Sequence, residues 1–160
     1  MSRAEALLSD PPTPAFPLEE LEGRLLVLYD GECGLCNRSI RLMLRRDRRD
    51  RLRFAANSDP RAVQLLAEHG IVPPQAAPDT IVVLRNIGTP LEDMLVRSNA
   101  VLACLRALPQ PWPMAAALLR LIPRPFRELG YRQIASLRYR FFGRLATCPI
   151  PTPAERSHFL

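Results

Sequence analysis

The sequence predicts an α/β fold built on one small mixed sheet in the order β-α-β-α-β-β-α, followed by a helical extension at the C-terminal end. Three observations support this prediction. Short, largely apolar runs at 25–29, 52–56 and 80–84 are typical of buried strands. Stretches with helical periodicity lie between these runs. The 160 residues, of which 48% are hydrophobic, suit one domain with its own core.

The first half of the chain alternates strands with helices. The strand at 25–29 ends at an Asp-Gly pair, which is typical of a turn. Apolar side chains then recur on one face from about 34 to 47, which predicts a helix. After the strand at 52–56, the residues Ser58-Asp59-Pro60 predict the start of a second helix. Both helical connections are long enough for a parallel crossover.

The second half begins with the β-branched run 80–84, the predicted third strand. A turn at 86–90 would return the chain as an antiparallel strand over 91–96. Ser98 is expected to cap the helix that follows. Beyond residue 109, prolines separate two more helices.

This order of elements is that of a minimal thioredoxin or glutaredoxin fold. It predicts a flexible, Pro-rich leader over 1–24, a thioredoxin-like core over 25–108, and a helical extension with an irregular tail over 109–160 that packs on the core. The last helix is amphipathic, with an apolar stripe expected to pack inward and a solvated Arg-rich face opposite. The stripe consists of Phe126, Leu129, Gly130, Ile134, Leu137 and Phe141.

The net charge of +6 comes from 22 basic residues that are all Arg. A sequence rich in Arg, Ala and Pro without Lys is typical of a compositionally biased genome, so the charge does not indicate nucleic-acid binding. The charge is uneven, because residues 94–160 carry ten Arg and two acids, a net +8. This part could meet an anionic membrane surface or an acidic partner.

The four cysteines, at 33, 36, 104 and 148, are too few for a disulfide scaffold in a chain of this length. Residues 1–24 are acidic and lack the basic start and apolar stretch of a secretory signal. The expected compartment is therefore a reducing cytoplasm. There, a close cysteine pair is catalytic or metal-binding more often than structural.

Cys33 and Cys36 lie three positions apart at the predicted first turn of a helix, so their side chains share one face. Backbone N–H groups that lack helical partners, together with the helix dipole, would stabilise a thiolate on Cys33. We therefore expect Cys33 to be the exposed attacking thiolate and Cys36 the resolving thiol. Gly34 would let a substrate backbone come close.

Asp30 has two interpretations. It could accept a proton from the resolving cysteine beneath the helix start. It could equally be a turn residue that closes the strand. The residues alone leave both interpretations open.

The segment from Tyr29 to Asn37, with its Asp-x-x-Cys-x-x-Cys pattern, resembles the signature of the DCC family of thiol-disulfide oxidoreductases. The resemblance covers about residues 25–160 and implies a thioredoxin-like fold and a dithiol–disulfide activity without naming a substrate. It extends through Arg45-Arg46-Asp47, Phe54-Ala55, the strand after Asp79, Arg97 to Leu102, Ile122 to Pro125, Tyr131-Arg132 and Arg138 to Gly143.

Two positions depart from related patterns. Typical thioredoxins place a cis-Pro just before the third strand of this order, whereas this chain has Asp79-Thr80 there, with Pro78 one residue early. In this respect it resembles the DCC family more than thioredoxin itself. Asn99 stands where the DCC pattern commonly has Asp, which changes the charge at a helix start.

Alternative functions come from the remaining residues. A structural zinc site would need four ligands, and the candidates besides the dithiol are not paired at short spacing. They are Cys104, Cys148, His69 and His158. Cys104 is expected to be a buried small hydrophobe, and Cys148 is either a further resolving thiol or a structural cysteine. The Arg-rich C-terminal helices could instead make the chain a peripheral binding or adaptor protein.

The sequence thus predicts a cytoplasmic thiol-disulfide oxidoreductase with catalytic Cys33, Cys36 and Asp30 and no bound cofactor. Its partner would be a disulfide-containing protein or a small thiol. Nucleic acid is not an expected partner, and contact with a membrane surface is the less favoured alternative.

Overall fold

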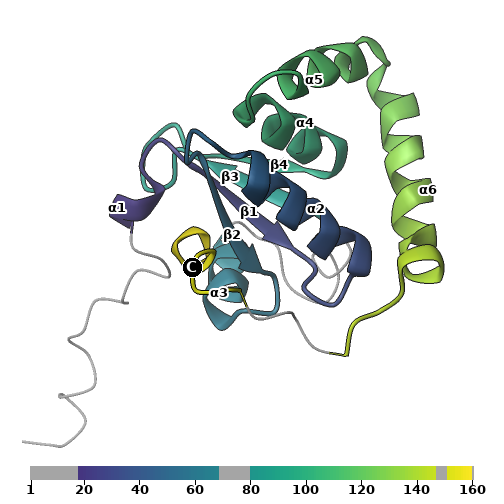
Figure 1. The fold of residues 1–160 in the computed structure, drawn as a ribbon. Coiled ribbons are helices and arrows are strands. Elements are labelled where there is room, and N and C mark those ends of the chain that lie inside the picture. Colours follow the sequence, from purple (N-terminus) through teal and green to yellow (C-terminus); the bar gives the residue numbers. More distant parts are fainter. Residues whose placement is uncertain (1–17, 69–79, 147–150, 160) are drawn as a thin grey trace, which may run out of the picture.

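The computed structural model describes residues 18–68, 80–146 and 151–159. Its centre is a four-stranded sheet in the order β2-β1-β3-β4 (Figure 1). Strands β1 and β2 are parallel, and the other two pairings are antiparallel. The strands are β1 Leu25–Tyr29, β2 Leu52–Ala56, β3 Val82–Arg85 and β4 Asp93–Val96.

Helices lie on both faces of this sheet. The α-helices are α1 Leu18–Leu21, α2 Gly34–Arg46, α3 Pro60–Glu68, α4 Arg97–Ala107, α5 Trp112–Leu121 and α6 Arg124–Phe142, and a 3-10 turn, η2, covers Arg156–His158. In Figure 1, α6 stands at the edge of the molecule beyond α2 and α4, and it contacts both of these helices.

The alternation of side chains along β1 divides the core into two layers. Leu26 and Leu28 join the cluster that includes Leu65 and Leu66 of α3. Val27 and Tyr29 point to the opposite face, into the cluster formed with α2 and α4. Because successive strand residues face opposite sides, a strand that is apolar throughout is buried on both faces, as the sequence predicted.

The predicted α/β thioredoxin-like fold is confirmed, with one correction to the strand directions. The helical connection from β1 to β2 is a parallel crossover, as expected. The connection from β2 leads instead to β3, which runs antiparallel to β1. A connection of that length permits either direction, so its length could not decide this point.

The expected role of Ser98 is also corrected. The residue that caps α4 is Val96, and no side chain bonds the free N–H groups there. Ser98 lies inside the helix and is buried. Its hydroxyl donates to the carboxylate of Glu128 on α6 and accepts from Arg127 Nε at 3.0 Å. Ser98 therefore joins α4 to α6.

The apolar stripe of α6 does not pack inward as predicted. Phe126, Leu129 and Ile134 are 65%, 55% and 60% exposed. The side chain that is buried on this helix is Arg138, at 4% exposed. This buried cation meets a buried carboxylate on the core, as described below.

The end of the chain returns to the sheet. Phe159 bridges Phe54 of β2, with ring centroids 5.8 Å apart. Residues 1–17 of the predicted leader, and His69, Pro78, Asp79 and Cys148, lie outside the described residues. Among the described helices, none is both long enough and apolar enough to cross a bilayer.

Candidate active site

Cys33 occupies the N-cap position of α2, directly after β1 and its turn. Its backbone is extended, with φ −82° and ψ 119°, and its Sγ accepts a hydrogen bond from the N–H of Cys36 at 3.3 Å. N-cap positions usually hold a side-chain oxygen that satisfies one of the free N–H groups of the first turn. Here the acceptor is the sulfur of Cys33, so the first thiol of the pair itself caps the helix.

Cys36 lies one turn into the helix and is half-buried. Burial, followed by the hydrogen bond and the charge of Cys33, raises the pKa of Cys36 to about 12. The two thiols are free in this structure. The dithiol is therefore asymmetric: one sulfur accepts a helix N–H, and the other retains its proton.

The expected exposure of Cys33 is wrong, because Cys33 is 0% exposed. The segment 142–145, which we call the strap, follows α6 and crosses the start of α2. Arg144 forms a β-bridge with Cys33. On either side of it, Gly34 N–H donates to Gly143 O at 3.3 Å, and Leu145 N–H donates to Glu32 O at 2.7 Å.

Gly34 is needed for this crossing. A Cβ at Gly34 would lie 2.3 Å from the carbonyl oxygen of Phe142, closer than real contacts allow. The sequence suggested that Gly34 admits a substrate backbone. In the structure, the backbone that approaches it is the chain's own.

Asp30 lies beneath the dithiol and is 8% exposed. Its Oδ1 accepts a hydrogen bond from the Glu32 N–H at 2.9 Å. One carboxylate oxygen of Asp30 therefore has the role of a turn residue. Its Oδ2 accepts from Arg138 at 3.3 Å and from the hydroxyl of Tyr139. The charge of Asp30 also contributes to the raised pKa of Cys36, as the smallest of the causes.

Arg138 and Tyr139 are site residues that the sequence analysis missed. The charge of Arg138 acts on Cys36 by lowering its pKa, which partly opposes the effect of burial. Burial raises the pKa of Tyr139 to about 12, and its hydrogen bond to Asp30 acts in the same direction. The available signal was the resemblance of the segment from Arg138 to Gly143 to the family pattern, without a role for either side chain.

A cavity of about 410 Å³ lies against Cys36, between α2, α4 and the last two helices. Its walls are almost entirely apolar and include Ile40, Ile81, Val101 and Ile134. The sequence analysis did not predict this cavity, since its walls come from elements that are far apart in the chain. The cavity gives the half-buried Cys36 thiol an apolar surface on its open side.

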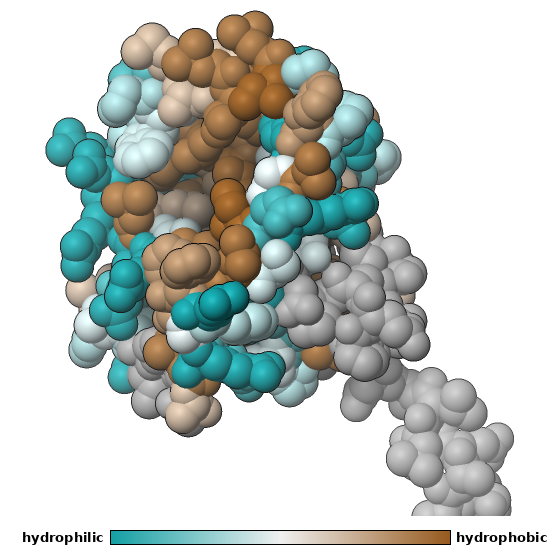
Figure 2. Space-filling view, turned by 90° about the vertical axis from the view of Figure 1, so that its right-hand side faces the viewer, coloured by the Kyte–Doolittle hydropathy of each residue, from teal (hydrophilic) through white to brown (hydrophobic). Residues whose placement is uncertain are grey.

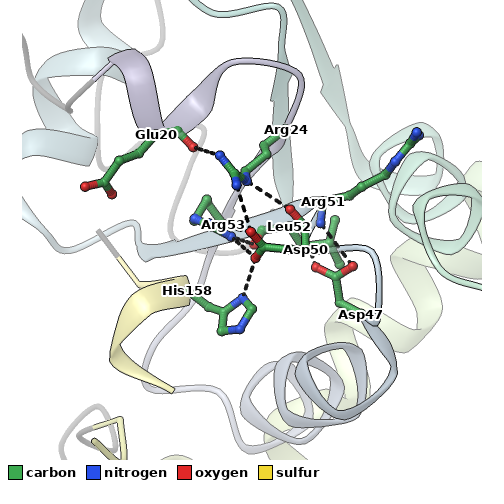
Figure 3. Close-up of polar contacts among 8 residues, drawn as sticks. All are labelled: Glu20, Arg24, Asp47, Asp50, Arg51, Leu52, Arg53 and His158. Atoms are coloured by element: carbon green, nitrogen blue, oxygen red, sulfur yellow. Dashed lines mark hydrogen bonds and ion pairs between the residues drawn. The ribbon is translucent and has the colours of Figure 1, made fainter. Parts of the chain in front are cut away.

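A second cluster of titratable side chains lies at the other end of α2, where Asp47, Asp50 and His158 converge (Figure 3). Asp47 accepts from the N–H groups of Arg51 and Leu52, at 3.1 and 2.8 Å. Through these hydrogen bonds, the carboxylate holds the loop that leads into β2.

Asp50 lies among basic side chains. Arg24 and Arg53 each lie 2.7 Å from its carboxylate, and His158 lies 3.5 Å away (Figure 3). The hydrogen bond from Arg53, followed by that from Arg24, holds the pKa of Asp50 well below its usual range. The ion pairs of Asp50 tie residue 158 to the core, and the carboxylate of Asp47 is held by backbone N–H groups.

Of the other predicted metal candidates, Cys104 is fully buried within the core. Burial raises its pKa to about 12. This agrees with its expected role as a small hydrophobe. The described residues therefore do not place Cys104 or His158 beside the dithiol as further ligands.

A mixed sheet with two free thiols at the start of the helix after its first strand defines a dithiol protein of the thioredoxin-like class. The chain belongs to the DCC1-like thiol-disulfide oxidoreductase family, whose model matches residues 27–144. This confirms the resemblance seen in the sequence.

Two relatives are similar over most of the chain. The uncharacterized protein YuxK of Bacillus subtilis is 29% identical over 142 residues, which are 89% of this chain and 97% of YuxK. A DCC family protein of Arabidopsis thaliana, described as chloroplastic, is 29% identical over 131 residues, or 82% of this chain and 72% of that protein. No solved structure matches the chain.

Proposed function

We propose that the protein is a thiol-disulfide oxidoreductase in which Cys33 attacks and Cys36 resolves. One observation carries this proposal: Cys33 Sγ caps α2 and accepts the Cys36 N–H at 3.3 Å. The attacking sulfur thus lies at the end of a helix among its free N–H groups, while Cys36 keeps its proton until it is needed as the second nucleophile.

The proposed exchange conserves atoms and electrons, and it needs no cofactor. The Cys33 thiolate attacks one sulfur of a substrate disulfide, a Cys33–substrate disulfide forms, and the other half leaves as a thiolate. Cys36 then loses its proton and attacks Cys33 Sγ, which releases the second substrate thiol. The dithiol is oxidised by two electrons and the substrate is reduced by two.

Asp30 is the proposed proton acceptor for Cys36. Its burial and the influence of its charge on Cys36 support this role. The hydrogen bonds from Arg138 and Tyr139 to Oδ2 make these two residues positioning groups for the carboxylate. Replacing Asp30 by Asn should therefore slow the resolving step more than the first attack.

Attack by Cys33 requires the strap to move, because the sulfur is fully buried beneath it. The cavity beside Cys36 suggests that the substrate disulfide carries apolar groups. We propose a disulfide-containing protein or a small thiol as the partner. The proposed place of action is the cytoplasm, which localisation of the tagged protein would test.

The decisive experiment measures the reduction potential of the dithiol. A value of about −270 mV would make the protein a reductase, and a value of about −120 mV an oxidant. Cys36→Ser should form a trapped mixed disulfide at Cys33 but no intramolecular bridge. The proposal fails if the wild type forms no reversible Cys33–Cys36 disulfide, or if Cys33→Ser still reduces disulfides.

A further inference from the structure

The outer surfaces of α5 and α6 form one large apolar face. Figure 2 shows hydrophobic side chains that run together across this side of the molecule, around a hollow and between hydrophilic flanks. We call this surface the apolar face. Its side chains include Met114, Leu118, Leu121, Phe126, Leu129 and Ile134, each more than half exposed.

Polar side chains make many of the contacts that hold α6 on the rest of the chain. Arg127 bonds Ser98 and Asn99 of α4. Arg138 pairs with Asp30. Phe126 and Ile134 line the open cavity on the same helix and stay more than half exposed. An apolar surface this extensive on a folded chain marks a site of contact with a protein or a membrane.

The charge around the apolar face has a single sign. Arg120, Arg124, Arg132 and Arg140 are exposed on the same two helices. From residue 94 to residue 154 the sequence contains one acid, Glu128. That carboxylate accepts the hydroxyl hydrogen bond of Ser98. The helices of this face thus carry exposed cations and no exposed acid. Such a face is complementary to a partner that has an apolar region bordered by anionic groups.

We propose that the apolar face docks on the surface of an anionic lipid bilayer, with its side chains at the acyl boundary and the Arg groups among the headgroups. Amphipathic helices that lie in the membrane interface combine Phe and Leu with flanking cations in this way. Phe126 and Ile134 belong to the face and also line the cavity beside Cys36. Docking therefore turns the cavity toward the lipid.

This inference does not depend on the thiol chemistry, and its test does not measure redox activity. The reduced full-length protein is sedimented with phosphatidylcholine vesicles, with and without phosphatidylglycerol, at low and high salt. Binding should require the anionic lipid and should weaken as salt screens the Arg groups.

Two pairs of variants separate the face from the rest of the surface. Leu121→Ser should weaken binding by about tenfold, whereas Leu91→Ser, at a Leu of similar exposure (76% against 78%), should not change it. Arg124→Glu should weaken binding by at least about fivefold, and Arg49→Glu, at an exposed Arg outside the face, should weaken it much less. Urea unfolding curves verify that each variant is folded.

Three outcomes overturn the proposal. The first is absence of binding to anionic vesicles at low salt. The second is equal loss of binding in the face variants and their controls. The third is a wild-type dimer that Leu121→Ser, but not Leu91→Ser, converts to monomer in sedimentation, because the face would then be an interface between two copies of the chain.

Discussion

The carboxylate of Asp30 and the guanidinium of Arg138 lie 3.3 Å apart although 108 positions separate them in the chain. Asp30 directly follows β1, three residues before Cys33, and Arg138 lies on the last long helix. Both side chains are almost fully buried, at 10% and 4% exposed. This pair joins α6 to the core beside the dithiol, near the point where the strap crosses Cys33.

Removing the cation from this pair should destabilise the fold strongly. Arg138→Met leaves the Asp30 carboxylate buried without its cation, which should lower the free energy of unfolding by about 3 kcal/mol. Arg144→Met is the matched control, because the Arg144–Glu32 pair joins the same two regions but is 68% and 52% exposed. It should cost less than about 1 kcal/mol. Urea unfolding of both variants measures the difference, and equal costs would contradict the role given to Arg138.

Adding one methyl group at Gly34 should open the strap. The new Cβ would meet the Phe142 carbonyl, so Gly34→Ala should increase the rate at which iodoacetamide modifies Cys33, as followed by mass spectrometry. Gly130→Ala is the control, since no atom lies within 4 Å of its Cβ position. It should leave Cys33 protected and stabilise α6 by up to about 1 kcal/mol. Unchanged protection in Gly34→Ala would show that the strap does not limit access.

The stability of the reduced protein should fall as the pH rises from about 9 to 12. Burial raises the pKa of Cys36 and of Cys104 from 9.0 to about 12. In that interval the unfolded chain releases thiol protons that the folded chain retains, so unfolding becomes more favourable with pH. Cys36→Ala and Cys104→Ala should each reduce the slope of unfolding free energy against pH. A slope that neither variant changes would contradict these assignments.

Asp47, the residue that ends α2, should stabilise the loop before β2. Its carboxylate accepts the N–H groups of Arg51 and Leu52 and is 7% exposed. Asp47→Ala leaves these donors without that acceptor, which should cost about 2 kcal/mol. Asp93→Ala, which breaks an exposed pair with Arg85, should cost less than about 1 kcal/mol in the same unfolding assay. If Asp47→Ala costs no more than Asp93→Ala, the carboxylate of Asp47 does not stabilise the loop.

Much of the fold was predictable because its signals are local. The continuous apolar run 25–29 predicted β1 with its observed bounds, and the run 52–56 did the same for β2. The position of Cys33 at the start of a helix was predictable for the same reason. These features depend on neighbouring residues, which a sequence places next to one another.

The parts that could not be predicted depend on contacts between distant residues. The periodicity of α6 shows which side chains share a face, but it does not show which face meets the core. A stripe containing Phe126 and Ile134 would normally be buried. Here the buried side chain of α6 is Arg138, whose partner follows β1, and the stripe stays largely exposed around an open cavity. The burial of Cys33 under residues 142–145 likewise follows from where α6 ends.

In the proposed mechanism, the reactivity of the dithiol depends on the strap as well as on the chemistry of the two thiols. Two backbone hydrogen bonds and one exposed ion pair hold Arg144 and its neighbours over Cys33. The observed rate of exchange is then the intrinsic rate of the open state multiplied by the fraction of molecules that are open. Abundant small thiols and disulfides would meet a closed protein most of the time. A partner that binds the open form would itself raise that fraction, so selectivity would arise from gating.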